Sequence, residues 1–494
     1  MRGKREAAPN KKSGKSRWVS GVGLISAAVV IAVAAVFAWL VWQTQLLPVK
    51  LMSYLCAALG VVVLIVALFL LNHRNTVRYI LGVILALGLT AALVMGGMAV
   101  QRGVAALNRI TTAEQEIEYI GVYVLKDDPI PHLEDAGDYM FGLWSGMDAD
   151  IAKKTVATLN EALKKEIKVS AFETIPELLD ALFNKDIDAM IFPDAFFGLL
   201  TDMEGYQDTE EKIRPLITLD FAVESGELEK PTMPDHTFTV YISGIDSLYG
   251  MQARSRSDVN ILAHVNTRTH QVLLVSTPRD YYVPLSISDG VPDKLTHAGI
   301  YGVNVSKDTV GMIYDMDIDY YFRVNFEGFE AIIDALGGVD VMSEYTFNVG
   351  PKYWYYEGMN HLNGEEALIF ARERYTFAEG DRQRGKHQMA VIQGVINKVL
   401  SPEILKNYVS VLEAVEGNFE TTVPYELLAT LVRDQLDSNP DWEIISYSVD
   451  GTGDTQYVYS MSIPVYVLHP DWDTVNVVKD LVAKMEDNQR ISAP

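Results

Sequence analysis

The sequence has very little cysteine: Cys56 is the only one among 494 residues. A single thiol cannot form an intrachain disulfide, which excludes the small, disulfide-stapled class of secreted domains. A chain of this length is long enough for roughly two or three domains, and these can fold on hydrophobic cores alone.

Acidic residues are nearly absent from the N-terminal part of the chain. Before residue 110 there is one, Glu6, beside twelve basic residues, so the rest of the chain holds 29 basic and 64 acidic residues, a net charge of −35. Such a surface repels nucleic acid, so we expect no nucleic-acid partner. A polyanionic ligand would have to be held by a local basic pocket or by a metal ion.

Charged residues are also absent from three long apolar runs, residues 19–42, 51–71 and 79–100. Each run has roughly the 20 residues that cross a hydrocarbon core, so the sequence predicts three transmembrane helices after a basic tail, residues 1–18. A signal peptide would have a shorter apolar core and no further spans behind it. The alternative, buried helices of a soluble domain, fits such lengths poorly.

The basic flanks of these runs predict the orientation. The first loop carries only Lys50, whereas the second carries Arg74 and Arg78. The tail carries Arg2, Lys4, Arg5, Lys11, Lys12, Lys15 and Arg17. We therefore expect a multi-pass protein of the cell membrane with a cytoplasmic N-terminus and extracellular C-terminal domains.

The exterior part has an α/β pattern with two regions. Residues 111–230 alternate strand-like runs (121–125, 167–172, 188–192) with helical ones (152–165, 175–183), and predict a small accessory domain with a structural or interaction role. Residues 226–234 are rich in charge and proline and predict a linker. Residues 235–494 predict a larger α/β domain with a central sheet flanked by helices. Its predicted strands are 238–242, 259–265 and 272–275, and its predicted helices are 308–314, 326–336, 362–370, 385–400, 404–415, 425–436 and 474–485.

Charged residues stand at the ends of the predicted strands of the larger domain. Asp246 follows the first strand, Arg256 and Asp258 precede the second, and Arg279 follows the third. If the strands are neighbours, these side chains converge on one sheet edge, where ligands of open α/β sheets bind. Carboxylates supply ligands for Mg²⁺, and arginines bind phosphate oxygens bidentately.

A second cluster begins with Arg372 and Arg374, which would face the same way if this segment were extended. It is followed by Asp381, Arg384, Lys386 and Gln388, while Lys294 and His297 lie between the two clusters. Each charged pair alone fits a surface salt bridge, and His297 alone fits a packing residue. The concentration of arginines in an acidic domain favours a phosphate-binding site.

These segments resemble the LytR–CpsA–Psr family of cell-wall enzymes over about residues 235–400. The motifs are SGID, RSDVNIL, VSTPRDYYV, KLTHA, YYFRVNFEGFEAIIDALGGVDV, ARERY and GDRQRGKHQ, in that order. The three spans and the accessory domain further resemble the capsule-associated subgroup. Members attach glycopolymers, such as teichoic acids and capsular polysaccharides, from a polyprenyl pyrophosphate donor to peptidoglycan, assisted by Mg²⁺.

The resemblance implies a role for each matching residue. Asp246 and Asp258 would hold Mg²⁺, and Asp381 would be the base near the acceptor hydroxyl, forming the catalytic group with Arg372 and Arg374. The pyrophosphate would be bound by those two arginines and by Arg256, Arg279, Lys294, Arg384 and Gln388. The chain departs from the family's frequent residues at Leu248, Thr277 and His387.

The predicted function is thus a membrane-anchored phosphotransferase that joins a glycopolymer to peptidoglycan and releases polyprenyl phosphate. The partners would be the lipid-linked donor, the peptidoglycan acceptor, the membrane and other polysaccharide-assembly proteins. The same residues would also serve a hydrolase of the lipid pyrophosphate. A non-catalytic regulator or scaffold of polysaccharide assembly is a third interpretation.

The lipid tail of the donor would need an apolar tunnel. Any hydrophobic core requires the same residue types, so these residues are candidates for either role. The candidates are Val259, Ile261, Leu262, Phe326, Phe329, Ile332, Ile333, Phe370, Val391, Ile392 and Val395.

Overall fold

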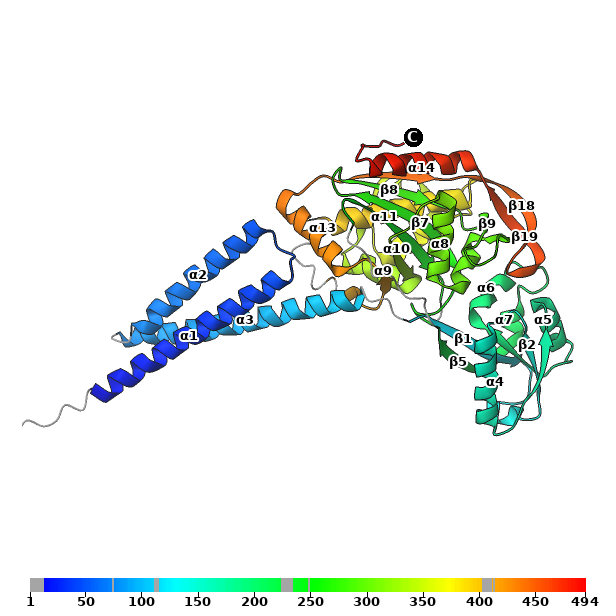
Figure 1. Ribbon diagram of the computed structural model, residues 1–494, viewed down its shortest axis with the longest axis horizontal. Coiled ribbons are helices and arrows are strands. Elements are labelled where there is room, and N and C mark those ends of the chain that lie inside the picture. The colour runs from blue at the N-terminus through cyan, green and yellow to red at the C-terminus, as the bar shows by residue number, and fades with distance from the viewer. Residues whose placement is uncertain are drawn as a thin grey trace, which may run out of the picture. The chain divides into compact units, whose positions relative to one another are not determined.

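The computed structural model describes residues 13–72, 75–110, 115–223, 234–247, 249–401, 411 and 414–494. The chain divides into two compact units (Figure 1). The first comprises Met1–Arg109, Pro402–Glu413 and Tyr425–Pro440, and the second Ile110–Ser401, Ala414–Pro424 and Asp441–Pro494. The predicted linker (apart from Pro234) and Leu248 lie outside the described residues, as does most of the predicted helix 404–415.

The first unit is built on α1 (Ser13–Gln43), α2 (Val49–Leu71) and α3 (Thr76–Ile110). In the described part of the chain, these are the three helices long and apolar enough to cross a membrane. Large apolar side chains on them are exposed, such as Leu24 and Leu87, because a helix within lipid needs no polar face. The three predicted spans are confirmed, and the chain is a membrane protein. Helix α3 continues past residue 100, where the apolar run ends.

The first unit also contains a helix that is distant in sequence, α13 (Tyr425–Ser438). The hydroxyl of Tyr425 donates to the Thr44 carbonyl at 2.7 Å, and Lys50 Nζ lies 3.3 Å from an Asp437 carboxylate oxygen. The predicted domain 235–494 includes this helix, whereas the structure groups it with the spans. Helical periodicity identified the helix but carries no information about such long-range contacts.

The N-terminal part of the second unit, the accessory region, has a five-stranded sheet in the order β3-β2-β4-β1-β5. Strand β2 is parallel to β3 and β4, and β1 is antiparallel to β4 and β5. Helix α5 begins with the capping box of Thr174 and Glu177, which satisfies backbone N–H groups of its first turn. The elements are β1 (Ile117–Leu125), η1 (Leu133–Ala136), β2 (Met140–Trp144), α4 (Ala149–Leu163), β3 (Lys168–Phe172), α5 (Ile175–Phe183), β4 (Ala189–Pro193), η2 (Asp194–Phe196), α6 (Phe197–Leu200), α7 (Thr209–Lys212) and β5 (Ile213–Ala222).

The larger region has a six-stranded mixed sheet in the order β16-β11-β6-β7-β8-β17. Its strands are β6 (Thr237–Ile245), β7 (Ser257–Asn266), β8 (Gln271–Ser276), β11 (Tyr320–Asn325), β16 (Phe419–Thr421) and β17 (Glu443–Ser448). Its helices are η3 (Leu295–Tyr301), α8 (Val303–Tyr314), α9 (Phe326–Ala335), α10 (Gly364–Arg372), α11 (Asp381–Val399) and α14 (Trp472–Glu486). Short paired strands complete it: β9 (Tyr282–Pro284), β10 (Pro292–Lys294), β12 (Val339–Ser343), β13 (Phe347–Val349), β14 (Tyr353–Tyr355), β15 (Gly358–Leu362), β18 (Gly451–Val458) and β19 (Met461–Pro470).

Helices cover both faces of this sheet, which confirms the predicted α/β fold. Leu262 of β7 packs in one core with residues of α8 and α14, while its neighbour Ile261 packs in another with Met389 of α11. Adjacent strand residues point to opposite faces. The proposal that Leu262 and Ile261 line one tunnel is therefore wrong.

The accessory region and the larger region share a core. The cluster under the accessory sheet includes Val465 and Val467 from the β18–β19 hairpin of the larger region. A buried ion-pair network adds to the contact: Arg323 of β11 lies 3.0 Å from Glu116, just before β1, and 2.6 Å from Glu420 of β16. These contacts fix the accessory region beside the strand ends of the larger sheet.

Candidate active site

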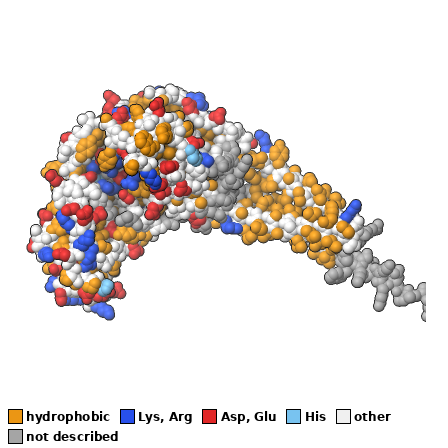
Figure 2. All heavy atoms as spheres, turned by 180° about the vertical axis from the view of Figure 1, so that it is seen from behind, with side chains coloured by type: hydrophobic (Ala, Val, Ile, Leu, Met, Phe, Trp, Pro, Cys, Tyr) orange, Lys and Arg blue, Asp and Glu red, His pale blue; other side chains and the backbone are white. Residues whose placement is uncertain are grey.

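A cavity of about 410 Å³ lies at one edge of the larger sheet, and we call it the arginine cavity. It contains five arginines and three aspartates, so its lining is cationic although the chain has a net charge of −24. Figure 2 shows Lys and Arg side chains gathered beside carboxylates on one face of the second unit. The lining residues are Thr201, Asp202, Asp246, Arg256, Asp258, Val259, Arg279, Phe326, Arg372, Arg374, Tyr375, Arg384 and Gln388.

Both predicted clusters meet in this cavity. Asp246 follows β6, Asp258 lies at the start of β7 and Arg279 follows β8, as their positions at the strand ends indicate. Arg384 and Gln388 are four residues apart on α11, so they lie on one face of that helix. Of the ten predicted site residues, Lys294 and Asp381 do not line this cavity; they line a neighbouring one.

Asp258 is the most constrained carboxylate of the arginine cavity. Its Oδ1 accepts hydrogen bonds from Arg279 Nη1 at 3.0 Å and from Thr296 Oγ1 at 3.1 Å. Burial raises the pKa of Asp258, but Arg279, Arg256 and Arg384 together hold it below the ordinary value. The side chain is therefore ionised at neutral pH and available as an oxygen ligand.

The two arginines of the ARERY motif, Arg372 and Arg374, lie in different local structure and make different contacts beside the arginine cavity. Arg372 is the last residue of α10, so the expectation of an extended Arg372–Arg374 segment is wrong at its first residue. The guanidinium of Arg372 lies over the Phe326 ring, 4.3 Å from its centroid. Arg374 Nη2 donates to the Tyr375 hydroxyl at 2.7 Å. The guanidinium of Arg374 also lies over the Tyr375 ring, 4.8 Å from its centroid, so both arginines make cation–π contacts.

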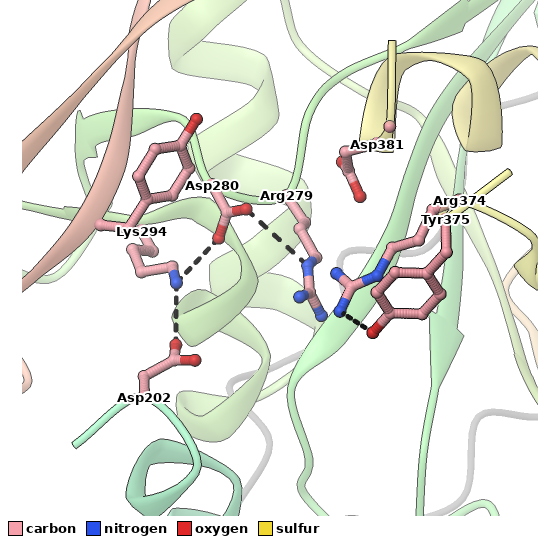
Figure 3. Close-up of a pocket in the computed structure, with 9 residues that line it drawn as sticks. Asp202, Arg279, Asp280, Lys294, Arg374, Tyr375 and Asp381 are labelled. Atoms are coloured by element: carbon pink, nitrogen blue, oxygen red, sulfur yellow. Dashed lines mark hydrogen bonds and ion pairs between the residues drawn. The ribbon is translucent and has the colours of Figure 1, made fainter. Parts of the chain in front are cut away.

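The second cavity, of about 450 Å³, is shown in Figure 3, and we call it the Lys294 cavity. It shares Arg279 with the arginine cavity and brings in Asp381, the first residue of α11. The Asp381 carboxylate forms an ion pair with Arg384. Burial lowers the pKa of Arg384, and the neighbouring guanidinium groups of Arg279 and Arg374 act in the same direction. Its lining residues are Asp202, Arg279, Asp280, Lys294, Arg374, Tyr375, Gly380, Asp381 and Tyr466.

Lys294 is held by two carboxylates in this second cavity. Its Nζ lies 2.8 Å from Asp202 of the accessory region and 2.8 Å from Asp280 (Figure 3). Burial opposes the charge, yet Asp280 and Asp202 raise the pKa of Lys294. Asp202 could not be found from the sequence, because it lies in the accessory region, distant along the chain from the motifs.

Two histidines of the motifs, His297 and His387, are buried and contact other protein side chains. His297 is fully buried, with Nδ1 2.7 Å from Asp293 Oδ1 and 2.9 Å from Ser460 Oγ, as the packing interpretation expects. His387 lies among aromatic rings, stacked 5.3 Å from Phe347, and burial lowers its pKa to about 4. Thr296 was missed, although the KLTHA motif contains it.

The carboxylates of the arginine cavity suit a hard divalent cation. In the described part of the chain, three or more His, Cys, Asp or Glu side chains do not meet anywhere in a metal-binding group. Asp246 and Asp258 nevertheless line one cavity. Mg²⁺ is commonly bound by one or two carboxylates, with substrate phosphate oxygens and water completing its shell. The pair fits such an ion better than Zn²⁺, whose structural sites need four protein ligands.

The chain is similar to curated transferases. The chain is 36% identical over 199 residues to the polyisoprenyl-teichoic acid–peptidoglycan teichoic acid transferase TagU of Enterococcus faecalis, an alignment that covers 40% of this chain and 65% of the relative. Identity to the Bacillus subtilis TagU is 33% over 217 residues, covering 44% and 69%. The chain thus spans less than two thirds of the Enterococcus relative.

The chain is also similar to solved structures. The crystal structure of B. subtilis TagU has 28% identity and a TM-score of 0.41, and the match covers 53% of this chain and all of that one. A structure of TagT bound to LI-WTA has 26% identity and a TM-score of 0.41, and covers 51% and 90%. The LytR-CpsA-Psr family model matches residues 201–467, more than half of the chain, and the chain therefore belongs to that family.

Proposed function

We propose that this protein transfers a glycopolymer from a polyprenyl pyrophosphate donor to peptidoglycan, as a membrane-anchored phosphotransferase. The observation that carries the proposal is the arginine cavity, where five guanidinium groups and an ionised Asp258 meet. Guanidinium groups bind phosphate oxygens bidentately, and their concentration in an acidic chain favours a dianionic or more highly charged ligand. The names of the TagU relatives give the same donor and acceptor classes.

The reaction is a displacement at phosphorus. A hydroxyl of the acceptor glycan attacks the phosphorus next to the donor sugar, and the bond from that phosphorus to the bridging oxygen breaks. Polyprenyl phosphate leaves with the electron pair, and the acceptor proton passes to a base. Such transfers depend on positioning and charge neutralisation rather than covalent participation by the protein.

The chain's own residues divide this work. Arg256, Arg279, Arg372 and Arg374 would bind and orient the pyrophosphate, with Arg384 and Gln388 on α11 beside them. Asp381 faces the neighbouring cavity beside Arg279, where it would accept the proton of the acceptor hydroxyl. Asp246 and Asp258 would hold Mg²⁺, which when bound neutralises charge that develops on the pyrophosphate.

The test uses the full chain in lipid nanodiscs with a polyprenyl pyrophosphate-linked saccharide, peptidoglycan fragments and Mg²⁺, followed by mass spectrometry. A phosphodiester-linked product is expected from the wild type and not from Asp258→Ala. Asp308→Ala, an exposed aspartate on α8, is the matched control and should retain the activity. Full activity of Asp258→Ala would refute the role of this carboxylate.

Two other results would favour a different function for this protein. Release of polyprenyl phosphate without a glycan adduct would favour the hydrolase. An unchanged cellular phenotype for Asp246→Ala and Arg279→Ala would favour the regulator or scaffold.

We also propose the finer features that the sequence predicts. The basic flanks support an extracellular position for the second unit, and protease accessibility in intact cells tests it. The three spans and the accessory region support membership of the capsule-associated subgroup, for which the donor would be a capsular polysaccharide. Comparing capsular and teichoic acid donors in the nanodisc assay decides between them.

A further inference from the structure

The accessory region and the larger region enclose a third cavity, of about 550 Å³, which we call the tyrosine cleft. Its lining includes Tyr119, Tyr123, Asp194 and Glu210 of the accessory region, and Asp246 and Tyr249 of the larger region. Its volume lies within the range of small-molecule sites, roughly 300–1,000 Å³. Asp246 and Arg256 line both this cleft and the arginine cavity, so the two are contiguous.

Aromatic rings form one part of the cleft. The rings of Tyr119 and Tyr249 are stacked, with centroids 4.3 Å apart, and Tyr249 is 42% exposed. Phe197 meets Tyr123 edge to face, with centroids 4.9 Å apart. Stacking fixes the orientation of these rings before any ligand arrives, so a flat apolar face is available at little entropic cost.

The charges of the cleft balance, unlike those of the arginine cavity. Three carboxylates, of Asp194, Glu210 and Asp246, face three arginines. Two of these arginines are already engaged: Arg254 lies 3.4 Å from both Glu116 and Glu118, and Arg214 donates to the Asp128 carbonyl at 3.0 Å. A phosphate-rich ligand therefore gains little here, and the charged groups disfavour a lipid tail.

The carboxylates of the cleft differ in their accessibility. Asp194 belongs to the wall of the cleft, because its Oδ1 accepts from the Tyr123 hydroxyl at 2.7 Å, the Tyr249 hydroxyl bonds the same carboxylate, and its Oδ2 is buried. Glu210 is exposed on α7. Rings that stack on an apolar face, together with carboxylates that accept from hydroxyl and amide N–H groups, match the chemistry of a pyranose sugar.

We propose that the tyrosine cleft is a saccharide-binding subsite, built largely by the accessory region, that holds sugar units next to the transferred phosphate. Saccharide binding by the cleft does not depend on the proposed function. The identification of the bound sugar as part of the donor or the acceptor rests on that function. The saccharide belongs either to the donor chain or to the acceptor glycan. In either case, the cleft makes the enzyme prefer an oligosaccharide over a single sugar.

The first test measures binding without catalysis. Full-length protein in nanodiscs is mixed with a soluble oligomer of N-acetylhexosamine, and saturation-transfer NMR reports contact. Binding by the wild type should weaken about tenfold in Tyr249→Ala, which removes the stacked face. Tyr249→Phe keeps the ring, loses only the bond of the hydroxyl to Asp194, and should bind within about twofold of the wild type. Equal binding by the wild type, Tyr249→Ala and Glu210→Gln, or no binding at all, overturns the proposal.

The second test identifies the source of the sugar. The ratio of kcat/KM for an oligosaccharide to that for a single sugar is measured twice, once varying the donor and once varying the acceptor. Tyr249→Ala and Glu210→Gln should lower one of the two ratios. A lower donor ratio means that the cleft binds the donor saccharide, and a lower acceptor ratio means that it binds the acceptor glycan. Tyr457→Ala, an exposed tyrosine on β18, is the matched control. If the wild type transfers no glycan, the proposed function fails while the binding result still decides the cleft.

Discussion

The ammonium of Lys294 and the carboxylate of Asp202 lie 2.8 Å apart, and this pair joins the larger region to the accessory region beside the candidate active site. The Lys294 side chain is 5% exposed and also meets Asp280 at 2.8 Å. Pyrophosphate binding by Lys294 stays a prediction. The contacts indicate an additional role, which is to hold the wall of the Lys294 cavity in place.

Replacing Lys294 by methionine should destabilise the second unit. The change leaves the partly buried carboxylates of Asp202 and Asp280 without their cation, and the cost of about 3–5 kcal/mol for breaking a fully buried ion pair is the upper bound here. The apparent Tm of the second unit, followed by tryptophan fluorescence, should fall accordingly. Lys479→Met, on α14, is the control for loss of a lysine charge and should leave the Tm nearly unchanged. A wild-type Tm for Lys294→Met would show that the pair contributes nothing.

This stability difference should depend on pH in a defined way. The folded-state pKa of Lys294 is raised above 10.5, despite burial, by Asp280 and Asp202, so its contribution is complete below that value and is lost as pH rises through the raised pKa. Despite burial, Lys294 lowers the pKa of Asp202 below 3.8, so the contribution of Asp202 is lost only as pH falls through that lowered pKa. The Tm difference should therefore be constant between about pH 5 and pH 9 and shrink outside that window. A difference that changes within the window would contradict the assignment.

The sequence predicted much of the site because its residues are tied to local structure. Asp246, Asp258 and Arg279 lie at the ends of apolar strands, and parallel or neighbouring strands bring such ends together. The sequence could not predict Asp202 or the place of α13, because both depend on contacts between segments distant along the chain. The β18–β19 hairpin was missed as well, since half of it is exposed and lacks a clear apolar alternation.

Asp381→Asn should lower kcat far more than it raises KM. The amide keeps the shape of the side chain but cannot accept a proton, and loss of a general base typically costs about 10²–10⁴-fold. Glu379→Gln is the matched control, because Glu379 is an exposed acid two residues away that pairs with Lys386 at 3.1 Å. Initial rates at saturating donor separate the two effects. Equal losses in both variants would indicate a general electrostatic effect in place of proton transfer.

His387 should make the protein sensitive to acid. Burial lowers its folded-state pKa from 6.5 to about 4, so the unfolded chain binds the additional proton between these values. Stability therefore falls as pH drops from 6.5 towards 4, by roughly 2–3 kcal/mol from this residue. His387→Phe, which keeps an aromatic ring beside Phe347 and Phe370, should flatten this part of the Tm–pH curve. An unchanged slope would assign the acid sensitivity to other groups, such as His264, whose pKa burial also lowers to about 4.

The network around Arg323 allows a sharper test of how the accessory region is attached. Arg323 is 2% exposed, and besides its two ion pairs, Glu116 accepts from the Val303 backbone N–H at 3.0 Å and Glu420 from the Tyr321 hydroxyl at 2.6 Å. Arg323→Met leaves Glu420 buried without a cation and leaves Glu116 with Arg254 as its cationic partner, and should cost about 3–5 kcal/mol. Adding Glu116→Gln and Glu420→Gln removes those charges, so the triple variant should recover most of the loss. If the network only fills space, the three changes should instead add, and chemical denaturation of the single and triple variants distinguishes the two results because coupled residues deviate from additivity.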